Sequence, residues 1–326
     1  MPNKVGQPAI ISAMILISGG TGFVSRALIR RLNELGHSIR ILIRPAEKSP
    51  SLPVGIPVEV AVCSLSDPRG LRVAMKGVKT VFHLASSESS GNKADLMKVD
   101  IQGTENLAGA ARDAGVDRIY YLSHIGADRA SAYPMLKAKG IAETHIRNSG
   151  LDYTIFRTGL LYGIGDHLTT GLARLLNGMP LVFLLPGGGQ TLIQPLWIED
   201  LITCILWSLD DEKTRGQTYI LGGPEFLSFR RVVEIIIRKI GIHRWLVPIM
   251  PAYLRALTVI FEQSFQAFPV SVFWLDYLAA DRTTAIDSVA RNFGLLPSLF
   301  ESRLDYLSGE NWRGNLYQLL FKRMRG

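Results

Sequence analysis

The sequence predicts an α/β fold, a doubly wound parallel sheet joined to a smaller, mostly helical C-terminal subdomain. Short apolar runs alternate with amphipathic stretches of helical period through the first two thirds of the 326 residues. Strands separated by such helices form right-handed βαβ units, whose parallel sheet is buried on both faces. A content of 47% hydrophobic and 20% charged residues is that of an ordinary globular chain able to bury a core.

The expected strands and helices follow from the spacing of apolar residues and from the residues that stop helices. Gly36 stands where a left-handed residue ends a helix, and Ser228 and Gly241 bracket a helical stripe as N-cap and stop. The expected strands are 14–18, 38–43, 58–62, 80–84, 118–122, 153–157 and 218–221. The expected helices are 23–35, 68–76, 95–114, 132–148, 198–209 and 229–240.

The regular alternation breaks after Thr158, and this break predicts two domains. Residues 13–158, with returning segments at about 192–222, form the expected sheet domain. Residues 159–191, rich in Gly, Pro and Leu, and residues 223–326, which are mostly helical in pattern, form the expected substrate or lid subdomain. A cleft is expected between the two.

The composition argues against a disulfide-rich, a zinc-binding and a membrane-spanning protein. The two cysteines, Cys63 and Cys204, lie far apart and fit neither a disulfide framework nor a zinc site, which favours a reducing, cytoplasmic setting. No run of about 18 apolar residues is present, so a membrane-spanning helix is not expected. The first twelve residues lack the apolar length of a signal peptide, and Met14 would serve as a start.

The formal net charge of +8 leaves more than one interpretation open. A solvated surface with an anion site is the simplest, and a preference for an anionic membrane surface is the second. Nucleic acid is not expected as a partner, because no motif for its recognition is present. The basic end FKRMRG, beside LYQLLF, is compatible with peripheral contact with a membrane.

The stretch ILISGGTGFVSRALIRRL, residues 15–32, places four small residues between a strand and a helix. The pattern Gly20-x-Gly22-x-x-Ser25 in this context is the fingerprint of a dinucleotide-binding Rossmann unit. Glycines let the backbone approach a pyrophosphate, and the helix N-terminus offers that anion free N–H groups. Ser25 replaces the usual third glycine and is small enough to keep the helix close to the strand. The alternative is a turn that serves packing alone.

The end of the second strand indicates which dinucleotide is bound. NAD-binding proteins usually carry an acidic residue there, which holds the ribose 2′-hydroxyl. In SIRILIRPAEK the strand ends at Arg44, and no carboxylate follows before Glu47. A guanidinium suits a 2′-phosphate, so NADP(H) is favoured over NAD(H) as the cofactor. The alternative for Arg44 is a solvated charge at a strand end.

Tyr133 and Lys137 are a candidate catalytic pair at the start of the helix expected at 132–148. Their i, i+4 spacing places both side chains on one face of that helix. A phenol is a poor acid or base at neutral pH, and a neighbouring ammonium stabilises the phenolate. A surface pair is the alternative, but a position in the fifth βα unit of a dinucleotide-binding sheet favours catalysis.

The chain resembles the extended or atypical short-chain dehydrogenases/reductases, a superfamily that includes NAD-dependent epimerases and dehydratases. The resemblance covers about residues 13–225 and rests on GGTGFVS, VFHLAS, VDIQGTENL, YYLSHIGA, YPMLK, GLDYTIFRTGLLYG and QPLWIEDL, which follow the family's order. SHIGAD, YPMLKAKGIAE and IQPLWIEDL are most similar to the branch with the NADPH-binding accessory subunit of respiratory complex I and its bacterial relatives. That branch holds NADPH tightly, and its members are often not known to turn anything over.

The resemblance implies a role for each matching residue. The residues that would line the pyrophosphate are Gly19, Gly20, Thr21, Gly22, Phe23 and Val24. Arg44 would hold the adenosine end, Ala85 and Ser86 would pass beneath the ribose, and Thr158 and Leu160 would approach the nicotinamide. The catalytic group would be Ser123 facing the nicotinamide, Tyr133 as proton donor or acceptor, and Lys137 holding the nicotinamide ribose.

Three positions depart from the family pattern. The acidic residue that contacts adenine after the third strand falls at Ser64, and the usual asparagine of the NVxGT stretch is Asp100. His124 stands where many relatives have a second serine. The part of the mechanism that depends on serine is therefore less secure than the part that depends on Tyr133 and Lys137.

Other polar residues are weighed in the same way. His83 is expected to be a packed strand histidine, whereas His124, Asp166 and His167 lie near the predicted cleft as candidate substrate contacts. No cluster of His, Cys, Asp and Glu has the spacing of a metal site, so no metal is expected. No GxSxG turn indicates a hydrolase.

Residues 246–279 are rich in large apolar side chains. They are expected to form a lid over an apolar substrate cleft, or alternatively a surface for a bilayer, a lipid or quinone-like substrate, or a membrane complex. Two functions therefore stay open. One is an NADP(H)-dependent oxidoreductase or epimerase-like enzyme acting on a small molecule. The other is a non-catalytic NADPH-binding accessory or assembly protein of a membrane-associated complex.

Overall fold

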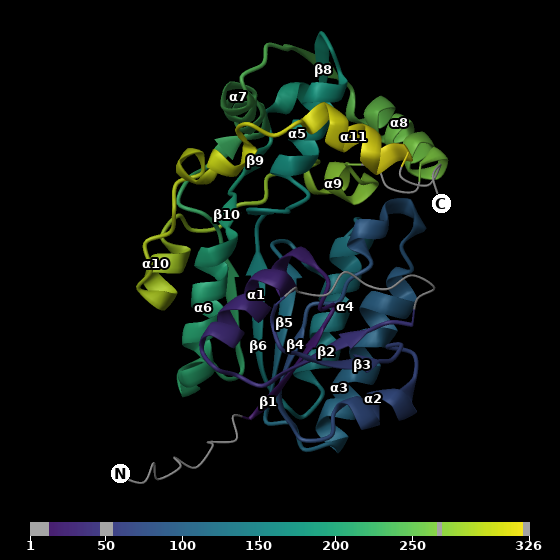
Figure 1. The fold of residues 1–326 in the computed structure, drawn as a ribbon, viewed down its shortest axis with the longest axis vertical. Coiled ribbons are helices and arrows are strands. Elements are labelled where there is room, and N and C mark those ends of the chain that lie inside the picture. The colour runs from purple at the N-terminus through teal and green to yellow at the C-terminus, as the bar shows by residue number, and fades with distance from the viewer. Residues whose placement is uncertain (1–12, 46–54, 266–268, 322–326) are drawn as a thin grey trace, which may run out of the picture.

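The computed structural model describes residues 13–45, 55–265 and 269–321 of the chain. The N-terminal segment, with the expectation about a signal peptide, and the basic residues 322–326 lie outside the described residues. Seven parallel strands form the central sheet, in the order β11-β6-β5-β4-β1-β2-β3 (Figure 1). The strands are β1 Met14–Ser18, β2 Ile39–Ile43, β3 Glu59–Val62, β4 Val78–His83, β5 Arg118–His124, β6 Asp152–Thr158 and β11 Gln217–Leu221.

This sheet confirms the expected doubly wound α/β fold. All seven strands predicted from apolar spacing are present, with ends that differ by at most two residues. The strand order reverses between β1 and β4, and open α/β sheets bind ligands at such a switch point, beyond the carboxyl ends of the strands.

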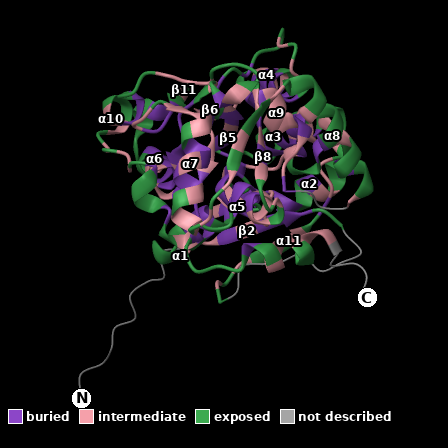
Figure 2. Ribbon diagram, turned by 90° about the horizontal axis from the view of Figure 1, so that it is seen from above, coloured by how far each residue is buried: buried purple, intermediate pink, exposed green. Residues whose placement is uncertain are grey.

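Helices cover both faces of the sheet and form two separate cores. On one face, α1 (Phe23–Glu34) and α6 (Ile198–Asp210) pack against the strands, and α10 (Ser288–Phe293) joins them at β11. On the other face lie α2 (Pro68–Ala74), α3 (Gly103–Asp113) and α4 (Pro134–Arg147). The buried residues lie along the strands and the inner helix faces, and the outer helix faces are exposed (Figure 2).

The prediction of one continuous α-helix over residues 95–114 was wrong in one respect. The structure begins it with a π-helical segment, η2 (Leu96–Gln102), and the α-helical part, α3, starts only at Gly103. A π-helical turn carries an extra residue and is common at functional sites. Here that segment carries the buried Asp100.

A second group of elements lies above the carboxyl ends of the strands (Figure 1). It contains α5 (Thr169–Gly178), α7 (Phe229–Ile240), α8 (Pro251–Ser264), α9 (Val272–Tyr277) and α11 (Trp312–Phe321). Ser228 caps α7 by accepting the Arg231 N–H, and Gly241 ends it with a φ of 71°, as the sequence predicts. Leu172, Phe183 and Ile236 belong to a third core, which is separate from the two that flank the sheet.

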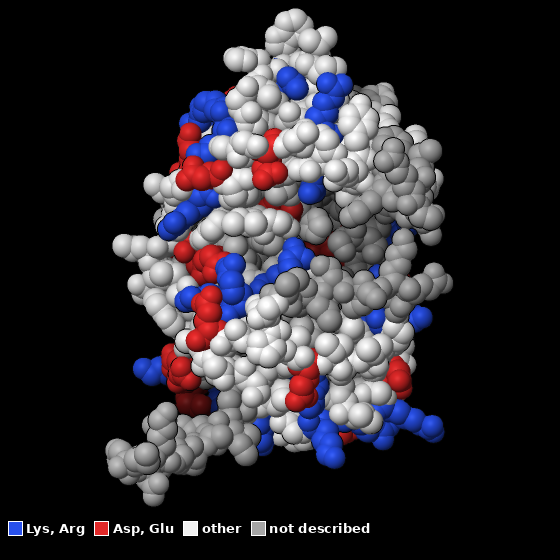
Figure 3. All heavy atoms as spheres, viewed as in Figure 1, with Lys and Arg blue, Asp and Glu red and all other residues white. Residues whose placement is uncertain are grey.

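This upper part is less purely helical than expected. Short strands pair within it: β8 (Val182–Pro186) with β13 (Trp245–Ile249), β9 (Leu192–Ile193) with β12 (Leu227–Ser228), and β7 (Leu161–Tyr162) with β10 (Leu196–Trp197). Among the described residues no helix combines the length and apolarity needed to cross a bilayer. Acidic and basic side chains are interspersed over the face shown in Figure 3.

Candidate active site

The turn after β1 brings its backbone against two neighbouring strands. A Cβ on Gly19, whose φ is 71°, would lie 2.8 Å from the backbone of Ala85, directly after β4. A Cβ on Gly20 would overlap the side chain of Ile41 on β2. The close approach therefore requires glycine at both positions.

Ser25 does more than keep the helix close to the strand. Its buried hydroxyl donates to the Gly19 carbonyl at 2.7 Å, and the Gly22 N–H donates to the same oxygen at 2.9 Å. Both bonds fix the turn from inside. No described side chain caps the start of α1, and its first turn carries no acidic residue. The N–H groups around Phe23 and Val24 thus stay available to an anion.

Arg44 lies directly beyond the carboxyl end of β2 and is exposed. Since β1 and β2 pair in register from Ile15 to Ser18, this end of β2 lies beside the glycine turn. No hydrogen bond or ion pair joins Arg44 to another residue in the part of the chain that the structure describes. Its charge is in the place that the adenosine end of a dinucleotide would reach.

The loop after β4 is held by a carboxylate from the π-helical segment. Asp100 accepts the Ser86 hydroxyl at 2.7 Å and both the N–H and the hydroxyl of Ser87. The Ser86 side chain is therefore engaged inside the protein, and the backbone of Ala85 and Ser86 remains for contact with a ribose. Asp100, noted as a departure from the family pattern, has a structural role here.

Tyr133 precedes the first turn of α4, and its side chain is half-buried. The Lys137 N–H donates to the Tyr133 carbonyl at 2.9 Å, so the pair occupies successive turns of one helix. Lys137 is exposed. The guanidinium carbon of Arg282, from the chain after α9, lies 5.3 Å from the centre of the Tyr133 ring. The phenol thus has a cation over its ring and an ammonium on the next turn.

Ser123 does not face the cleft as expected. It is 1% exposed, and its hydroxyl donates to Glu143 Oε1 on α4 at 2.6 Å. Side chains alternate along β5, so Ser123 points into the layer of α4, and Leu122 and His124 point to the opposite side. The strand register decides this orientation, which the local motif does not reveal.

Four residues gather where the two parts of the molecule meet, and sequence analysis names only one of them. His124 Nε2 lies 2.9 Å from Glu88 Oε2, and the His124 ring lies 6.1 Å from the ring of Tyr277 on α9. Arg282 lies over Tyr277 as well, at 5.9 Å. No sequence signal pointed to Glu88, Tyr277 or Arg282, because none lies in a recognisable motif.

Several polar atoms of this group are buried without a hydrogen-bond partner among the described residues: His124 Nδ1, the Tyr277 hydroxyl, and Arg282 Nε and Nη2. Buried polar atoms are normally paired, so such a set is a place where a bound molecule gains hydrogen bonds. Burial opposes the ionisation of Glu88, but His124 outweighs it and lowers the pKa of Glu88 to about 2. Burial raises the pKa of Tyr277, which keeps that phenol a neutral donor.

Comparison with known proteins agrees with this geometry. A family model described as NAD(P)H-binding matches residues 19–179, which include the glycine turn, Tyr133 and Lys137. The chain is 28% identical over 240 residues to NADH dehydrogenase [ubiquinone] 1 alpha subcomplex subunit 9, mitochondrial, of Arabidopsis thaliana. That match covers 71% of this chain and 59% of the relative. It is 27% identical to the photosystem II assembly factor Ycf39 of Cyanophora paradoxa, over 44% of each chain.

The solved structures show the same fold. The Escherichia coli NADPH-dependent quinone oxidoreductase QOR2 superposes with a TM-score of 0.71 at 19% identity, over 90% of this chain and 99% of that one. The structure of gox2253 gives a TM-score of 0.69 at 25% identity, over 90% and 96%.

The chain resembles the atypical short-chain dehydrogenases/reductases.

The glycine turn fits a nicotinamide dinucleotide. The tight turn that Gly19 and Gly20 allow, the uncapped start of α1 and the exposed Arg44 would together hold the pyrophosphate and the adenosine end of the dinucleotide. Thr158, at the carboxyl end of β6, is buried, and its carbonyl accepts the Ile125 N–H at 2.9 Å. It lies at the edge where the nicotinamide would be held.

Asp166 and His167, the two further candidate substrate contacts, have different environments. The buried carboxylate of Asp166 accepts the N–H groups of Gly163, Thr169 and Thr170, so it caps α5 and is not free for a substrate. His167 is exposed. Among the described residues, no three His, Cys, Asp or Glu side chains gather where they could hold a metal ion.

Proposed function

We propose that this protein is an NADP(H)-dependent oxidoreductase that interconverts a carbonyl and an alcohol, with Tyr133 as the acid or base. The position of Tyr133 carries the proposal. Arg282 lies 5.3 Å from its ring, and Lys137 follows on the next turn of α4. Tyrosine is one of the side chains that transfer protons in enzymes, and here two cationic side chains stand beside its ring and on the next helical turn.

A nicotinamide dinucleotide held at the glycine turn would supply or accept the hydride. Tyr133 moves the matching proton to or from the substrate oxygen, and Lys137 holds the ribose and the phenolate. His124, Tyr277 and Arg282 orient the substrate, since they are neighbours and each carries a polar atom without a partner among the described residues. Glu88 holds the His124 ring in position through the 2.9 Å contact.

The preference for NADP(H) is assigned to Arg44. A guanidinium gives a 2′-phosphate a bidentate, permanently charged partner, and Arg44 has no competing carboxylate among the described residues. Two relatives support a reductase. The chain is 30% identical over 171 residues to the ceramide reductase of Caulobacter vibrioides and 34% identical over 113 residues to a putative dihydroflavonol 4-reductase of Synechocystis.

The first test is fluorescence titration of the cofactor-free protein with NADPH and with NADH. We expect tighter binding of NADPH, and Arg44→Ala to weaken NADPH binding at least tenfold and leave NADH binding within about twofold, since a lost charge-assisted contact is worth about 1.5–3 kcal/mol. Arg112→Ala is the matched control, an exposed arginine at the far end of α3. Equal affinities of the wild type for both dinucleotides would contradict the assignment of Arg44.

A non-catalytic function is the second candidate. The relatives named as a complex I subunit and as a photosystem II assembly factor favour an accessory or assembly protein of a membrane-associated complex, which would hold NADPH without turning it over. The engagement of Ser123 with Glu143 favours it too, because that hydroxyl is unavailable for proton transfer.

Tyr133→Phe separates the two functions. An oxidoreductase should lose about 10²–10⁴-fold in turnover, the usual share of a general acid or base, and keep its affinity for NADPH. NADPH oxidation with a panel of aldehydes, ketones and quinones measures this, and Tyr253→Phe, exposed on α8, is the control. Undiminished turnover of Tyr133→Phe would remove Tyr133 from the mechanism. Tight NADPH binding by a wild type that turns over nothing in the panel favours the accessory function.

A further inference from the structure

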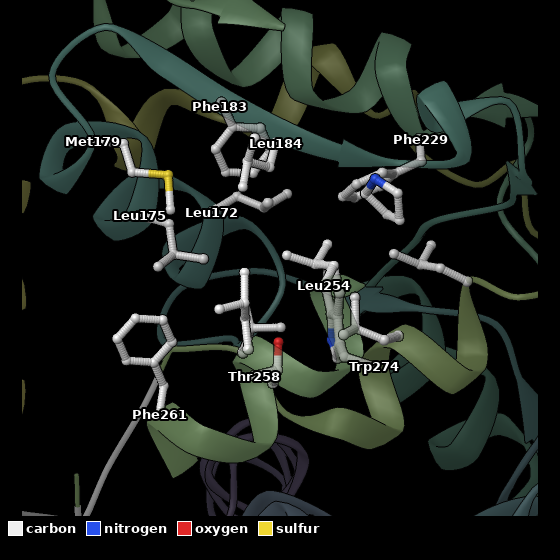
Figure 4. A pocket seen from close by; sticks show the side chains of 15 residues that line it. Leu172, Leu175, Met179, Phe183, Leu184, Phe229, Leu254, Thr258, Phe261 and Trp274 are labelled. Atoms are coloured by element: carbon white, nitrogen blue, oxygen red, sulfur yellow. The ribbon is translucent and has the colours of Figure 1, made fainter. Parts of the chain in front are cut away.

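A pocket of about 320 Å³ lies in the upper part of the molecule, away from the glycine turn (Figure 4). Its walls come from α5, β8, α8 and α9. Leu172 and Leu175 project into it from α5, Phe183 from β8, and Leu254 and Thr258 from α8. Ligand pockets in proteins begin at about this volume.

The chemistry of the walls excludes a polar ligand. Every described side chain that lines the pocket is uncharged, and the polar atoms among them are the Thr258 hydroxyl and the Trp274 indole N–H. A polar molecule brought into such a space would lose its hydrogen bonds to water without replacement. A ligand gains binding free energy in this pocket only by burying hydrocarbon, so any polar part of the ligand must stay outside the pocket.

The mouth of the pocket lies at α8. Leu257 and Phe261 line the pocket and are also 40% and 41% exposed, so they form its rim. Both charged residues of α8 interact with other groups of the protein. Arg255 pairs with Asp276 at 3.0 Å, and Glu262 accepts the N–H groups of Asn92 and Val272.

Apart from Arg255, the large exposed side chains along the first three turns of α8 are apolar, whereas the polar Gln263 and Ser264 are exposed at its end. Tyr253 and Ile260 are 64% and 57% exposed, and Met250, just before the helix, is 64% exposed. The apolar rim of the pocket therefore continues into further exposed apolar side chains, and the one exposed charged side chain of α8, Arg255, is paired with Asp276. Such a surface suits an amphiphile whose hydrocarbon chain is buried and whose head stays in water.

We propose that this pocket binds the hydrocarbon chain of a single-chain amphiphile, a fatty acyl or prenyl chain, which enters past Leu257 and Phe261 and leaves its polar head at α8. The site is separate from the proposed function and needs no cofactor. One helix connects the two places: Trp274 of α9 lines the pocket, and Tyr277 of the same helix faces His124.

The test is titration of the full-length protein with cis-parinaric acid, an intrinsically fluorescent fatty acid, followed by its emission. We expect saturable binding. Leu175→Trp and Leu254→Trp fill the pocket from opposite walls and should each weaken binding at least tenfold. Leu181→Trp is the matched control, because Leu181 is 69% exposed and does not line the pocket. Thr258→Val should leave binding unchanged, since no polar recognition is involved.

Thermal unfolding and NADPH titration of each variant establish that it is folded. Displacement of the probe by palmitate identifies an acyl chain and displacement by farnesol a prenyl chain, and either supports the proposal. Absence of saturable binding, or equal binding by the wild type and a folded pocket-filling variant, overturns it. Unchanged NADPH binding in that case would show that the proposed dinucleotide site does not depend on the apolar pocket.

Discussion

His83 is a fully buried imidazole held between two hydroxyl groups. Ser18 Oγ lies 2.7 Å from its Nδ1, and Thr104 Oγ1 lies 2.8 Å from its Nε2. The Thr104 hydroxyl donates to the Asp100 carbonyl, so its oxygen accepts from Nε2–H, and the hydrogen-bond network assigns this tautomer. The sequence-based expectation of a packed strand histidine is confirmed, and the residue links the glycine turn to the start of α3.

The free energy of unfolding should depend on His83 in mild acid. Burial lowers the pKa of His83 to about 3, whereas histidine in an unfolded chain titrates near 6.5. The unfolded state therefore takes up the proton first, and stability falls below about pH 6.5 by up to about 1.4 kcal/mol per pH unit.

Urea unfolding of His83→Gln from pH 7 to pH 4 checks this. The variant should be less stable at pH 7 and show a flatter loss of stability towards pH 4. His243→Gln, at an exposed position, is the control and should keep the wild-type slope. A wild-type slope in His83→Gln would show that other groups carry the acid sensitivity.

At the scale of an element, α4 presents different chemistry on different faces. Tyr133 and Lys137 lie at its start, on the cleft side, and Lys139 and Glu143 are buried against the sheet. Glu143 accepts Arg157 Nε and Nη2 at 2.8 and 2.7 Å, Arg147 Nη2 at 2.8 Å, and the Ser123 hydroxyl. These bonds fix the position of the helix that carries the proposed acid or base.

Glu143→Gln should destabilise the protein by about 3–5 kcal/mol, because it leaves the Arg157 guanidinium partly buried without its countercharge. Glu105→Gln on α3 is the matched control. That carboxylate is 57% exposed and 3.8 Å from His145, and its loss should cost less than about 1 kcal/mol. Chemical denaturation measures both. Similar losses in the two variants would mean that the buried carboxylate adds nothing beyond a surface contact.

At the scale of the whole molecule, one carboxylate ties the upper helices to the sheet domain. Glu262 on α8 accepts the Asn92 N–H, in the loop after β4, and the Val272 N–H at the start of α9, each at 3.0 Å. Gly91 lies so close to this carboxylate that a Cβ there would overlap it. The segment beside the proposed ribose contact therefore depends on α8 for its position.

Glu262→Gln should loosen this junction without unfolding the sheet. An amide keeps one acceptor oxygen and turns an NH₂ towards the second N–H, so about 1.5–3 kcal/mol of local stability is lost. Hydrogen exchange should show protection factors reduced at least tenfold near Asn92 and Val272, with unchanged protection in β1, β4 and β5. Gln263→Ala, at an exposed neighbouring position, is the control. Unchanged exchange in Glu262→Gln would contradict a tie at this residue.

The sequence by itself determined the parts whose signal is local. Apolar alternation located the seven strands, since a buried strand or helix face is encoded by the residues of that element alone. The glycine turn and the small residue at Ser25 could be predicted for the same reason, because tight turns and close backbone approach restrict residue type at consecutive positions. The i, i+4 relation of Tyr133 to Lys137 follows from helix geometry.

Only the tertiary structure decided what depends on distant segments. The register of β5 turned Ser123 towards Glu143, and Asp166 became a helix cap when α5 formed beside it. Arg282 and Tyr277 meet Tyr133 and His124 because the upper helices fold back over the sheet edge. The apolar pocket likewise exists between elements far apart in the chain. Such contacts depend on the packing of whole elements, and no local pattern of residue types encodes them.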